Sequence, residues 1–513
     1  MTTQSAPVSG RALRRLTRTA MQAHGGGSVT EMIGEAYGIV LTIVITGSLA
    51  LGAAQVLNAQ LRPSTIETTL HPVWLAVILA VASLGAVMSL SGRLGPLGMA
   101  GGQAAWWLPT PVDRRGLLRP RLVTGVLVAF GAGAGAGALI GALAGGQGSA
   151  VLMAAGVGAG GSLVALLVAA WLQVAGFGRS VPLAVTIGDA MVVCAPVAAL
   201  GVAVGRPAPP TGIAAATLAV AAAALMVVAV GMLALTDRRL DDISGAVLRA
   251  RGAVTAHAAG AATSLDTREL GRALTITSER DSRRRSVAFG WVRGPISALV
   301  TGDALLTLRS RRQMIALVAT VLIPVVVTLA GWASWTAVLA VLVGGYPAAL
   351  SATEGARRAE IAPVLDRSFP LDAKVVRRVR LIWPAAVTMV WTVVSVGTWA
   401  LLSGMALWPW LVLAVVAGPV FAAGAIRGAY RKPTDWSAPL ISNPMGPPIP
   451  PGLVGAISRG PDIVVICLLP LILGIVAVAA PATLLPWQLM ATLVAVAIAT
   501  HVPNPSSPFG TNP

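Results

Sequence analysis

Few side chains in this 513-residue sequence could do chemistry, and none of them forms a nucleotide-binding loop. A Walker A loop needs the pattern Gly-x-x-x-x-Gly-Lys-Ser/Thr, in which backbone N–H groups cradle the phosphates and the lysine contacts them. The chain has only two lysines, and residues Ala373 and Arg431 precede Lys374 and Lys432 where the loop needs glycine. The chain therefore cannot bind ATP by this route.

Residue types that ligate metals or act as nucleophiles are also dispersed. The histidines at positions 24, 71, 257 and 501 are isolated, and Cys194 and Cys467 lie in apolar stretches. Neither a zinc-type cluster nor a disulfide framework is indicated by such spacing. No Gly-x-Ser-x-Gly elbow with a histidine partner stands out either. We expect no metal and no cofactor, and we do not expect an enzyme.

Two acidic residues stand beside apolar sequence in matching surroundings. Asp189-Ala-Met-Val-Val-Cys194 is similar to Asp462-Ile-Val-Val-Ile-Cys467. An acid within a membrane span would indicate a substrate or proton site. Because a Gly-Pro dipeptide precedes Asp462, we favour the interpretation that both acids begin helices, where the helix dipole stabilises a carboxylate. The substrate or proton role remains the alternative.

The composition indicates that these residues stand in a membrane protein. Hydrophobic residues make up 56% of the chain and charged residues 11%, whereas soluble domains carry about a quarter charged residues. A membrane-spanning helix needs about 20 predominantly apolar residues. The predicted spans are Tyr37–Leu57, Val73–Leu90, Leu122–Leu143, Val151–Trp171, Ala190–Val204, Ile213–Leu235, Met314–Trp332, Trp335–Leu350, Leu381–Leu402, Trp410–Ala425, Ile463–Ala480 and Leu484–Ala499. The predicted fold class is therefore an all-α polytopic integral membrane protein with about twelve transmembrane helices, not a soluble multi-domain enzyme.

The distribution of basic residues predicts the orientation of these spans. If both termini are cytoplasmic, all but two of the 37 Lys and Arg residues lie on the inner side, the exceptions being Arg62 and Arg206. Such a bias is the positive-inside rule. We predict a multi-pass protein of the cell (plasma) membrane with both termini cytoplasmic. The net charge of +18 then faces lipid headgroups and cytoplasm, and no nucleic acid partner is expected.

Two loops indicate an internal duplication. They align without a gap, and each falls between the second and third predicted spans of one half. The aligned residues are Pro111, Asp113, Arg114 and Arg115 in the first loop and Pro370, Asp372 and Lys374 in the second. The alignment continues to Arg121 and Arg380. Since six spans are an even number, the sequence predicts two parallel six-helix repeats.

The predicted organisation follows from these repeats. It comprises a cytoplasmic N-terminal segment with an amphipathic helix (1–36), a first transmembrane half (37–235), a cytoplasmic linker with an amphipathic helix (236–313), a second transmembrane half (314–500) and a short cytoplasmic tail (501–513). The two amphipathic helices are expected at Ser9–Gln22 and Pro295–Arg312, where they would lie against anionic lipid. The alternative is that they are solvated basic flanks. Residues Arg238–Arg285 are predicted to link the halves.

Glycines within two spans predict close helix packing. Gly133, Gly137 and Gly141 recur every four residues in the third span, and Gly156 and Gly160 do so in the fourth. Small residues at this spacing let two helix backbones approach each other in a membrane. Plain packing is the interpretation we favour over a conduction path.

The first loop resembles the coupling loop in membrane subunits of exporter-class ABC transporters, where a Leu-Pro-x-Ser/Pro-x-Arg-Arg-x-Leu pattern is common. The matching segment is Leu108-Pro-Thr-Pro111-Val-Asp113-Arg114-Arg115-Gly-Leu117-Leu118. The second loop is a looser match because it lacks the Arg-Arg pair. The segments Asn443-Pro-Met-Gly-Pro and Arg459-Gly-Pro-Asp462 resemble an uncharacterised actinobacterial family of duplicated, twelve-span proteins similar to ABC-type permeases.

This resemblance implies an amphipathic elbow helix before each half and a coupling helix in each aligned loop. It also implies a partner, a separate ATP-binding cassette ATPase subunit that forms a dimer. The aligned loop residues would then contact the ATPase, or else they only anchor the spans on the positive side. The expected function is the transmembrane subunit of an ABC-type exporter of unknown substrate. The alternatives are a non-transporting scaffold or accessory subunit that docks a cytoplasmic partner, and a secondary transporter.

Overall fold

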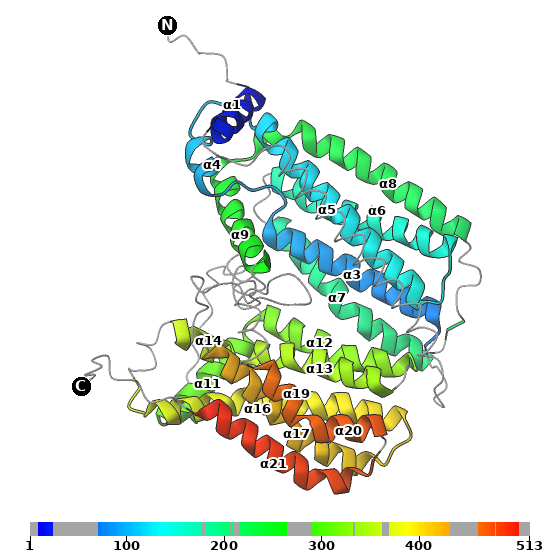
Figure 1. Cartoon of the computed structure of the whole chain (residues 1–513), viewed down its shortest axis with the longest axis vertical. Helices are drawn as coiled ribbons and strands as arrows, with labels where there is room; N and C mark the ends of the chain where they lie inside the picture. Colours follow the sequence, from blue (N-terminus) through cyan, green and yellow to red (C-terminus); the bar gives the residue numbers. More distant parts are fainter. Residues whose placement is uncertain are drawn as a thin grey trace. The chain divides into compact units, whose positions relative to one another are not determined.

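The computed structural model describes residues 9–23, 70–175, 180–205, 207–208, 215–263, 289–331, 334–361, 369–430, 460–477 and 479–501. All regular elements within these ranges are helices (Figure 1). The described residues form two compact units, one reaching to residue 263 and the other beginning at residue 289. The predicted first span, Tyr37–Leu57, lies outside the described residues.

The first unit contains one amphipathic helix, five long helices and three shorter segments. They are α1 (Gly10–Ala23), α3 (Pro72–Leu94), α4 (Gly101–Trp106), α5 (Arg114–Leu143), α6 (Ser149–Val174), α7 (Ser180–Gly205), α8 (Ala215–Arg238), the 3₁₀ turn η1 (Leu240–Asp242) and α9 (Gly245–Thr263). Within this unit α3 packs on α7, α5 packs on α6, and α6 packs on α8. Helix α1 contacts α5, and α9 contacts both α3 and α4.

The second unit has a comparable series of helices. They are α11 (Pro295–Leu308), α12 (Arg311–Leu329), α13 (Ser334–Ala352), α14 (Glu354–Ile361), α16 (Ala373–Leu402), α17 (Leu407–Ala429), α19 (Pro461–Cys467), α20 (Leu469–Ala477) and α21 (Pro481–Thr500). Here α16 packs on α17, α17 packs on α21, and α13 contacts α19 and α20. Helix α11 contacts α16 and α14.

Ten of the described helices are long and apolar enough to cross a membrane. They are α3, α5, α6, α7, α8, α12, α13, α16, α17 and α21. Eight of them contain a whole predicted span, while α8 begins after the start of its predicted span and α12 ends before the end of its own. The chain is thus a multi-pass helical membrane protein by the length and composition of its helices. The predicted eleventh span, Ile463–Ala480, is not one helix, because α19 ends at Cys467 and α20 begins at Leu469.

The break between α19 and α20 lies at a proline. Pro470 has no N–H to donate, so one hydrogen bond of a continuous helix is lost there. The hydrogen bond from the Leu471 N–H to the Cys467 carbonyl is also missing, and the fully buried Gln488 amide replaces it. Its Oε1 accepts from the Leu471 N–H at 3.2 Å, and its Nε2 donates to the Cys467 carbonyl at 3.0 Å. A side chain from α21 therefore satisfies the backbone groups of the interrupted helix, as the apolar interior of a membrane requires.

The glycines of the third span bring two helix backbones together, as predicted. A Cβ on Gly137 would lie 2.3 Å from the Ala154 carbonyl oxygen, and one on Gly133 would lie 2.4 Å from that of Gly158. Real Cβ atoms are not found at such distances, so alanine could not occupy these positions without moving α5 from α6. Gly160 instead faces Leu225 of α8. The role of these glycines in the described unit is packing.

Candidate functional site

The first predicted loop ends at Asp113, the N-cap residue of α5. Its Oδ1 accepts a hydrogen bond from the backbone N–H of Arg115 at 3.0 Å, and its Oδ2 accepts one from Gly116 at 3.1 Å. These bonds satisfy two of the first four N–H groups of the helix, which have no partner within it. The carboxylate of Asp113 is thereby engaged by its own helix.

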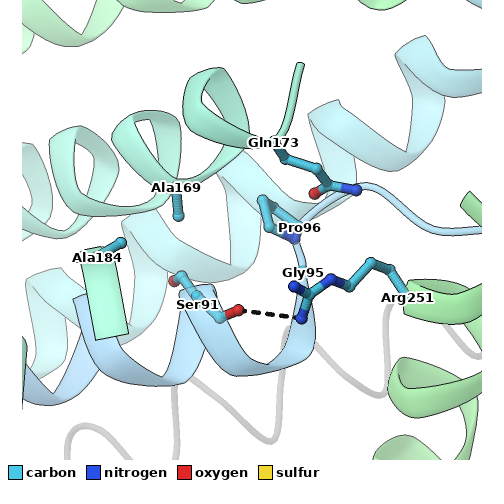
Figure 2. A pocket seen from close by; sticks show the side chains of 8 residues that line it. Ser91, Gly95, Pro96, Ala169, Gln173, Ala184 and Arg251 are labelled. Atoms are coloured by element: carbon cyan, nitrogen blue, oxygen red, sulfur yellow. Dashed lines mark hydrogen bonds between the residues drawn. The ribbon is translucent and has the colours of Figure 1, made fainter. Parts of the chain in front are cut away.

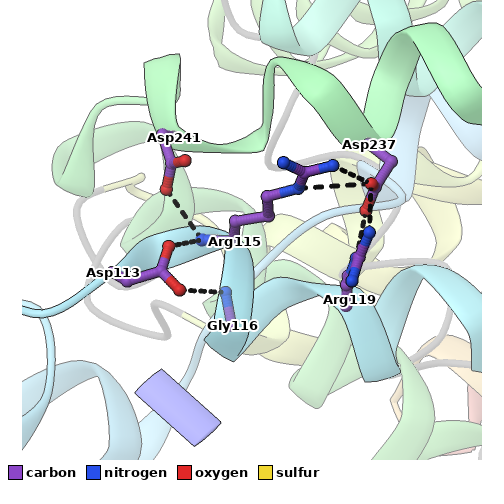
Figure 3. Close-up of polar contacts among 6 residues, drawn as sticks. All are labelled: Asp113, Arg115, Gly116, Arg119, Asp237 and Asp241. Atoms are coloured by element: carbon purple, nitrogen blue, oxygen red, sulfur yellow. Dashed lines mark hydrogen bonds and ion pairs between the residues drawn. The ribbon is translucent and has the colours of Figure 1, made fainter. Parts of the chain in front are cut away.

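Arg115 and Arg119 both bind Asp237, at the end of α8 (Figure 3). Nη2 of Arg115 lies 2.5 Å from Oδ2 of Asp237, and Nε of Arg119 lies 2.6 Å from Oδ1. The backbone N–H of Arg115 also donates to Asp241 of η1, at 2.8 Å. Two guanidinium groups thus share one carboxylate, and the contact joins the first two turns of α5 to the end of α8.

The exposed part of the first loop is uncharged. Arg114 is half-buried and donates from Nη1 to the Ile243 carbonyl, so the three predicted charged residues are all engaged within the unit. Pro111 is exposed, as is Pro109, and the Trp106 side chain at the end of α4 is 77% exposed. Residues 95–112 contain no charged side chain. A partner would therefore meet a tryptophan and prolines here, and the arginines would lie behind them.

The second predicted loop leaves its charges accessible. Pro370, Asp372 and Lys374 are all exposed, and the Asp372 side chain makes no capping hydrogen bond although it holds the N-cap position of α16. One turn later, Nη1 of Arg377 donates to the His501 carbonyl at 2.5 Å. The two loops belong to different units, and the second presents its charges without the ion pair that holds Arg115, whose side chain is 38% exposed.

Asp189 does not begin a helix, and the prediction for this residue is wrong. Helix α7 begins at Ser180, well before the predicted span, so Asp189 lies within it. Its carboxylate binds Arg93 of α3, with Nη2 at 2.8 Å from Oδ2, and accepts from the Ser89 hydroxyl at 2.6 Å. The Arg93 and Asp189 side chains are 11% and 15% exposed. The pair joins two candidate membrane helices.

For Asp462 the helix-start prediction is confirmed. It lies in the first turn of α19, and its Oδ1 accepts from the Gly460 N–H at 2.7 Å. Its Oδ2 lies 2.7 Å from Nη1 of Arg427, at the end of α17. Both side chains are two to three times as exposed as those of the Arg93–Asp189 pair, being 32% exposed for Arg427 and 28% for Asp462.

Sequence reasoning also missed the ion pair between Asp303 of α11 and Arg380 of α16. Nη1 of Arg380 lies 2.8 Å from Oδ1 of Asp303, and both side chains are buried. Trp383 adds a hydrogen bond from Nε1 to the Thr307 hydroxyl at 3.0 Å. Because the buried side of α11 carries these polar groups, α11 differs from the predicted amphipathic helix at Pro295–Arg312. The only sequence signal was an acid in an otherwise apolar segment.

Helix α9 caps the end of α3 (Figure 2). Nη1 of Arg251 donates to the Arg93 carbonyl at 3.2 Å, and the Thr255 hydroxyl donates to the Leu94 carbonyl at 3.0 Å. These bonds satisfy carbonyls that have no partner inside α3. Burial lowers the pKa of the Arg251 guanidinium. The hollow between Arg251, Gln173 and the end of α3 is too small to hold a ligand.

The backbone of the segment before α4 is in direct contact with the backbone of α9. The Met99 N–H donates to the Leu248 carbonyl at 2.9 Å. A Cβ on Gly252 would lie 2.2 Å from the Met99 carbonyl carbon, and one on Gly98 would lie 2.5 Å from the Gly252 nitrogen. Only glycine permits this approach. The linker region therefore contains a helix that fixes the first loop.

With this geometry in hand, comparison with known proteins gives one match. A family model described as "Family of unknown function (DUF6297)" matches residues 65–439, well over half of the chain. The chain belongs to this family. The match begins before α3 and ends beyond α17, so the family segment includes both predicted loops and both of the helices, α5 and α16, that follow them. No curated protein and no solved structure matches the chain.

Among the described residues of this family member, no group of three or more His, Cys, Asp or Glu side chains is placed to hold a metal ion. Four described aspartates, at positions 189, 237, 303 and 462, are instead paired with arginines of another helix. Such pairs can fix helices in place, and the exposed loops can contact a partner. The most accessible candidate sites are therefore two, the first loop with the start of α5 in one unit and the second loop with the start of α16 in the other.

Proposed function

We propose that this chain is the transmembrane subunit of an ABC-type exporter and works with a separate ATP-binding cassette ATPase. The proposal starts from the absence of a Walker A loop in the sequence, which leaves any ATP hydrolysis to another polypeptide. It further relies on a feature that occurs once in each unit. The substrate is outside the proposal.

The observation that carries the proposal is the equivalence of α5 and α16. Both helices are 30 residues long, and both follow an N-cap aspartate, Asp113 or Asp372. A short helix stands before each of them, α4 or α14, and another helix from earlier in the unit, α1 or α11, contacts each of them. This order supports an elbow helix, a coupling helix and a third span in each half.

Helix packing supports the two-repeat arrangement independently. If α3, α5, α6, α7 and α8 are spans two to six of the first half, the third span packs on the fourth and the fourth packs on the sixth. The same pairs pack in the second unit as α16 with α17 and α17 with α21. With α19 and α20 as one interrupted span and residues 37–57 as another, the proposal is twelve spans in two parallel repeats.

Orientation in the cell membrane follows from charge. The proposal places both termini, α9 and the two loops in the cytoplasm, because nearly all Lys and Arg residues then face inward. An ATPase dimer has two equivalent clefts on its surface, and one duplicated chain would supply two protruding loops, one for each cleft. One chain is therefore proposed per ATPase pair. In the first loop the contact would be made by Trp106 and the prolines. In the second loop it would be made by Asp372 and Lys374.

The scaffold function is the second candidate, and a specific observation favours it. Arg115 and Arg119 are held by Asp237, as residues that anchor a span would be, and are not free for a partner. A scaffold of this kind would dock a cytoplasmic protein without moving a substrate. The secondary transporter is less well supported, because the described Asp189 is already paired with Arg93.

Affinity purification of the full chain in mild detergent tests the proposal. We expect a co-purifying protein with a Walker A loop, at two copies per chain. Trp106→Ala combined with Lys374→Glu should reduce its recovery several-fold, whereas Trp408→Ala, which alters an equally exposed tryptophan at the start of α17, should not. Capture of a partner without an ATP-binding motif would support the scaffold, and transport that follows an ion gradient would support the secondary transporter.

A further inference from the structure

Two arginines occupy the same position in α5 and α16. Arg121 and Arg380 are aligned in the duplicated segment, and the helices that carry them have equal length and begin at aligned residues. Neither was assigned a role from the loop motif, which ends before them. Both side chains point toward the segment that precedes their helix.

Arg121 binds the first loop at two points. Nη1 donates to the Gly98 carbonyl, just before α4, and Nη2 donates to the Gln103 side chain within α4. The same segment is held on its other side by α9, through Gly252 and the hydrogen bond from Met99 to Leu248. Helix α4 is thus fixed between the body of α5 and α9.

Arg380 instead binds an acid from α11, on which α14 packs. It binds Asp303 of α11 at 2.8 Å, and the start of α14 lies directly on this pair. A Cβ on Gly355, in the first turn of α14, would lie 1.8 Å from Oδ1 of Asp303 and 3.0 Å from Nη1 of Arg380. Any displacement of α14 toward this site would therefore press on the ion pair, and through it on α16.

We propose that Arg121 and Arg380 are equivalent positioning residues that hold the short helices α4 and α14 against the starts of α5 and α16. Arg121 binds α4 directly, and Arg380 binds the acid on which α14 packs, so a force applied to either short helix reaches the long one. That a docked ATPase applies this force rests on the proposed function. The holding contact itself does not. The arginines touch no substrate and act through the helices that they position.

Hydrogen exchange of the full-length protein in detergent tests the contact in the first unit. Arg121→Gln removes a forked donor, and we expect the amides of α4 to exchange about ten-fold faster because their local opening becomes easier. Arg119→Gln is the matched control: it removes a neighbouring arginine on α5 that binds Asp237 of α8 and does not touch α4. In that control the end of α8 should exchange faster and α4 should not.

In the second unit, Arg380→Gln alone would leave Asp303 buried without its counter-charge and could prevent folding. The double variant Asp303→Asn with Arg380→Met removes both charges together and keeps the experiment interpretable. The amides of α14 should then exchange about ten-fold faster. Arg378→Gln, an exposed position on the same helix, should leave them unchanged.

The outcomes separate this inference from the proposed function. Faster exchange confined to α4 or α14 supports the positioning role, whether or not an ATPase is found. Unchanged exchange in both short helices, or an equal increase throughout the unit, would overturn it. If the exchange result holds and no ATPase ever co-purifies with the native chain, the positioning role stands and the exporter proposal fails.

Discussion

The ion pairs in this chain differ in how exposed their side chains are, and therefore in how well water can hydrate a charge whose partner has been removed. Arg93 and Asp189 are 11% and 15% exposed, while Arg427 and Asp462 are 32% and 28% exposed. Removing one partner of a buried pair leaves an uncompensated charge, whereas an exposed charge is readily hydrated. The two aspartates therefore should respond differently to the same substitution, although their sequence surroundings are alike.

Asp189→Asn should destabilise the protein by roughly 2–4 kcal/mol, because Arg93 then keeps its charge without a counter-ion. Asp462→Asn should cost about 1 kcal/mol or less, since the amide still accepts at the helix start. Thermal unfolding in detergent measures both. The double variant Arg93→Gln with Asp189→Asn should regain part of the loss. Equal, small shifts for Asp189 and Asp462 would contradict this account.

Local sequence reveals helix starts better than it reveals distant partners. The Gly-Pro dipeptide before Asp462 correctly predicted a helix start, and the aspartates at 113 and 372 hold N-cap positions. Asp189 was misplaced because α7 extends before the run that was read as its span. Its partner Arg93 is distant in the sequence, and no local pattern connects the two. The Asp303–Arg380 pair was missed for the same reason.

At the scale of elements, helix α9 shows that a predicted linker can hold other segments in place. Its sequence is rich in alanine and glycine, which predicted a connection between the halves and little else. The two glycines at 252 and 260 look alike in sequence, but Gly252 is buried against the Met99 backbone and nothing lies within 4 Å of a Cβ at Gly260. Only the folded structure distinguishes them.

Gly252→Ala should push α9 away from the first loop and destabilise the unit by about 1–3 kcal/mol, the usual cost of overpacking. Gly260→Ala adds the same methyl group where space is open, and should stabilise α9 by about 0.5–1 kcal/mol. Thermal unfolding of the purified chain compares the two. A similar effect of both substitutions would show that α9 is not seated as described.

The interrupted helix α19–α20 depends on a residue from another element. Pro470 predicts a local disturbance, yet α7 contains Pro196 and remains one helix. The difference lies in Gln488, whose amide enters the gap between Leu471 and Cys467. Because this contact joins separate segments, the sequence predicted one continuous span where the structure has two helices.

Gln488→Leu should leave both backbone groups without a partner in an apolar interior, at a cost of about 2–4 kcal/mol for the two hydrogen bonds. The Leu471 amide should also exchange faster with solvent. Met490→Leu, on the exposed side of the same helix, provides the control and should change neither quantity. If Gln488→Leu were as stable as the native protein, the interruption would not require the glutamine.

For the molecule as a whole, apolar run length predicted each of the ten candidate membrane helices that the structure describes. The two aligned loops also led to α5 and α16, which begin at aligned residues. Sequence could not give the contacts around these helices. The three charged residues of the first loop are engaged within the unit, and Trp106 is exposed without such a partner, because Asp237 and Ile243 come from elements later in the chain.

Membrane topology is the prediction on which the placement of both loops depends. Exposed positions are available on each predicted side: Gln147 and Trp408 outside, and Ala259 and Lys374 inside. Each is replaced singly by cysteine in a chain that lacks its two native cysteines. A membrane-impermeant maleimide should label the 147 and 408 variants in intact cells and the 259 and 374 variants only after lysis, because the basic residues keep the latter segments inside. Labelling of the 147 variant only after lysis would place the first loop, at the opposite end of α5, outside the cytoplasm, and would exclude its contact with an ATPase.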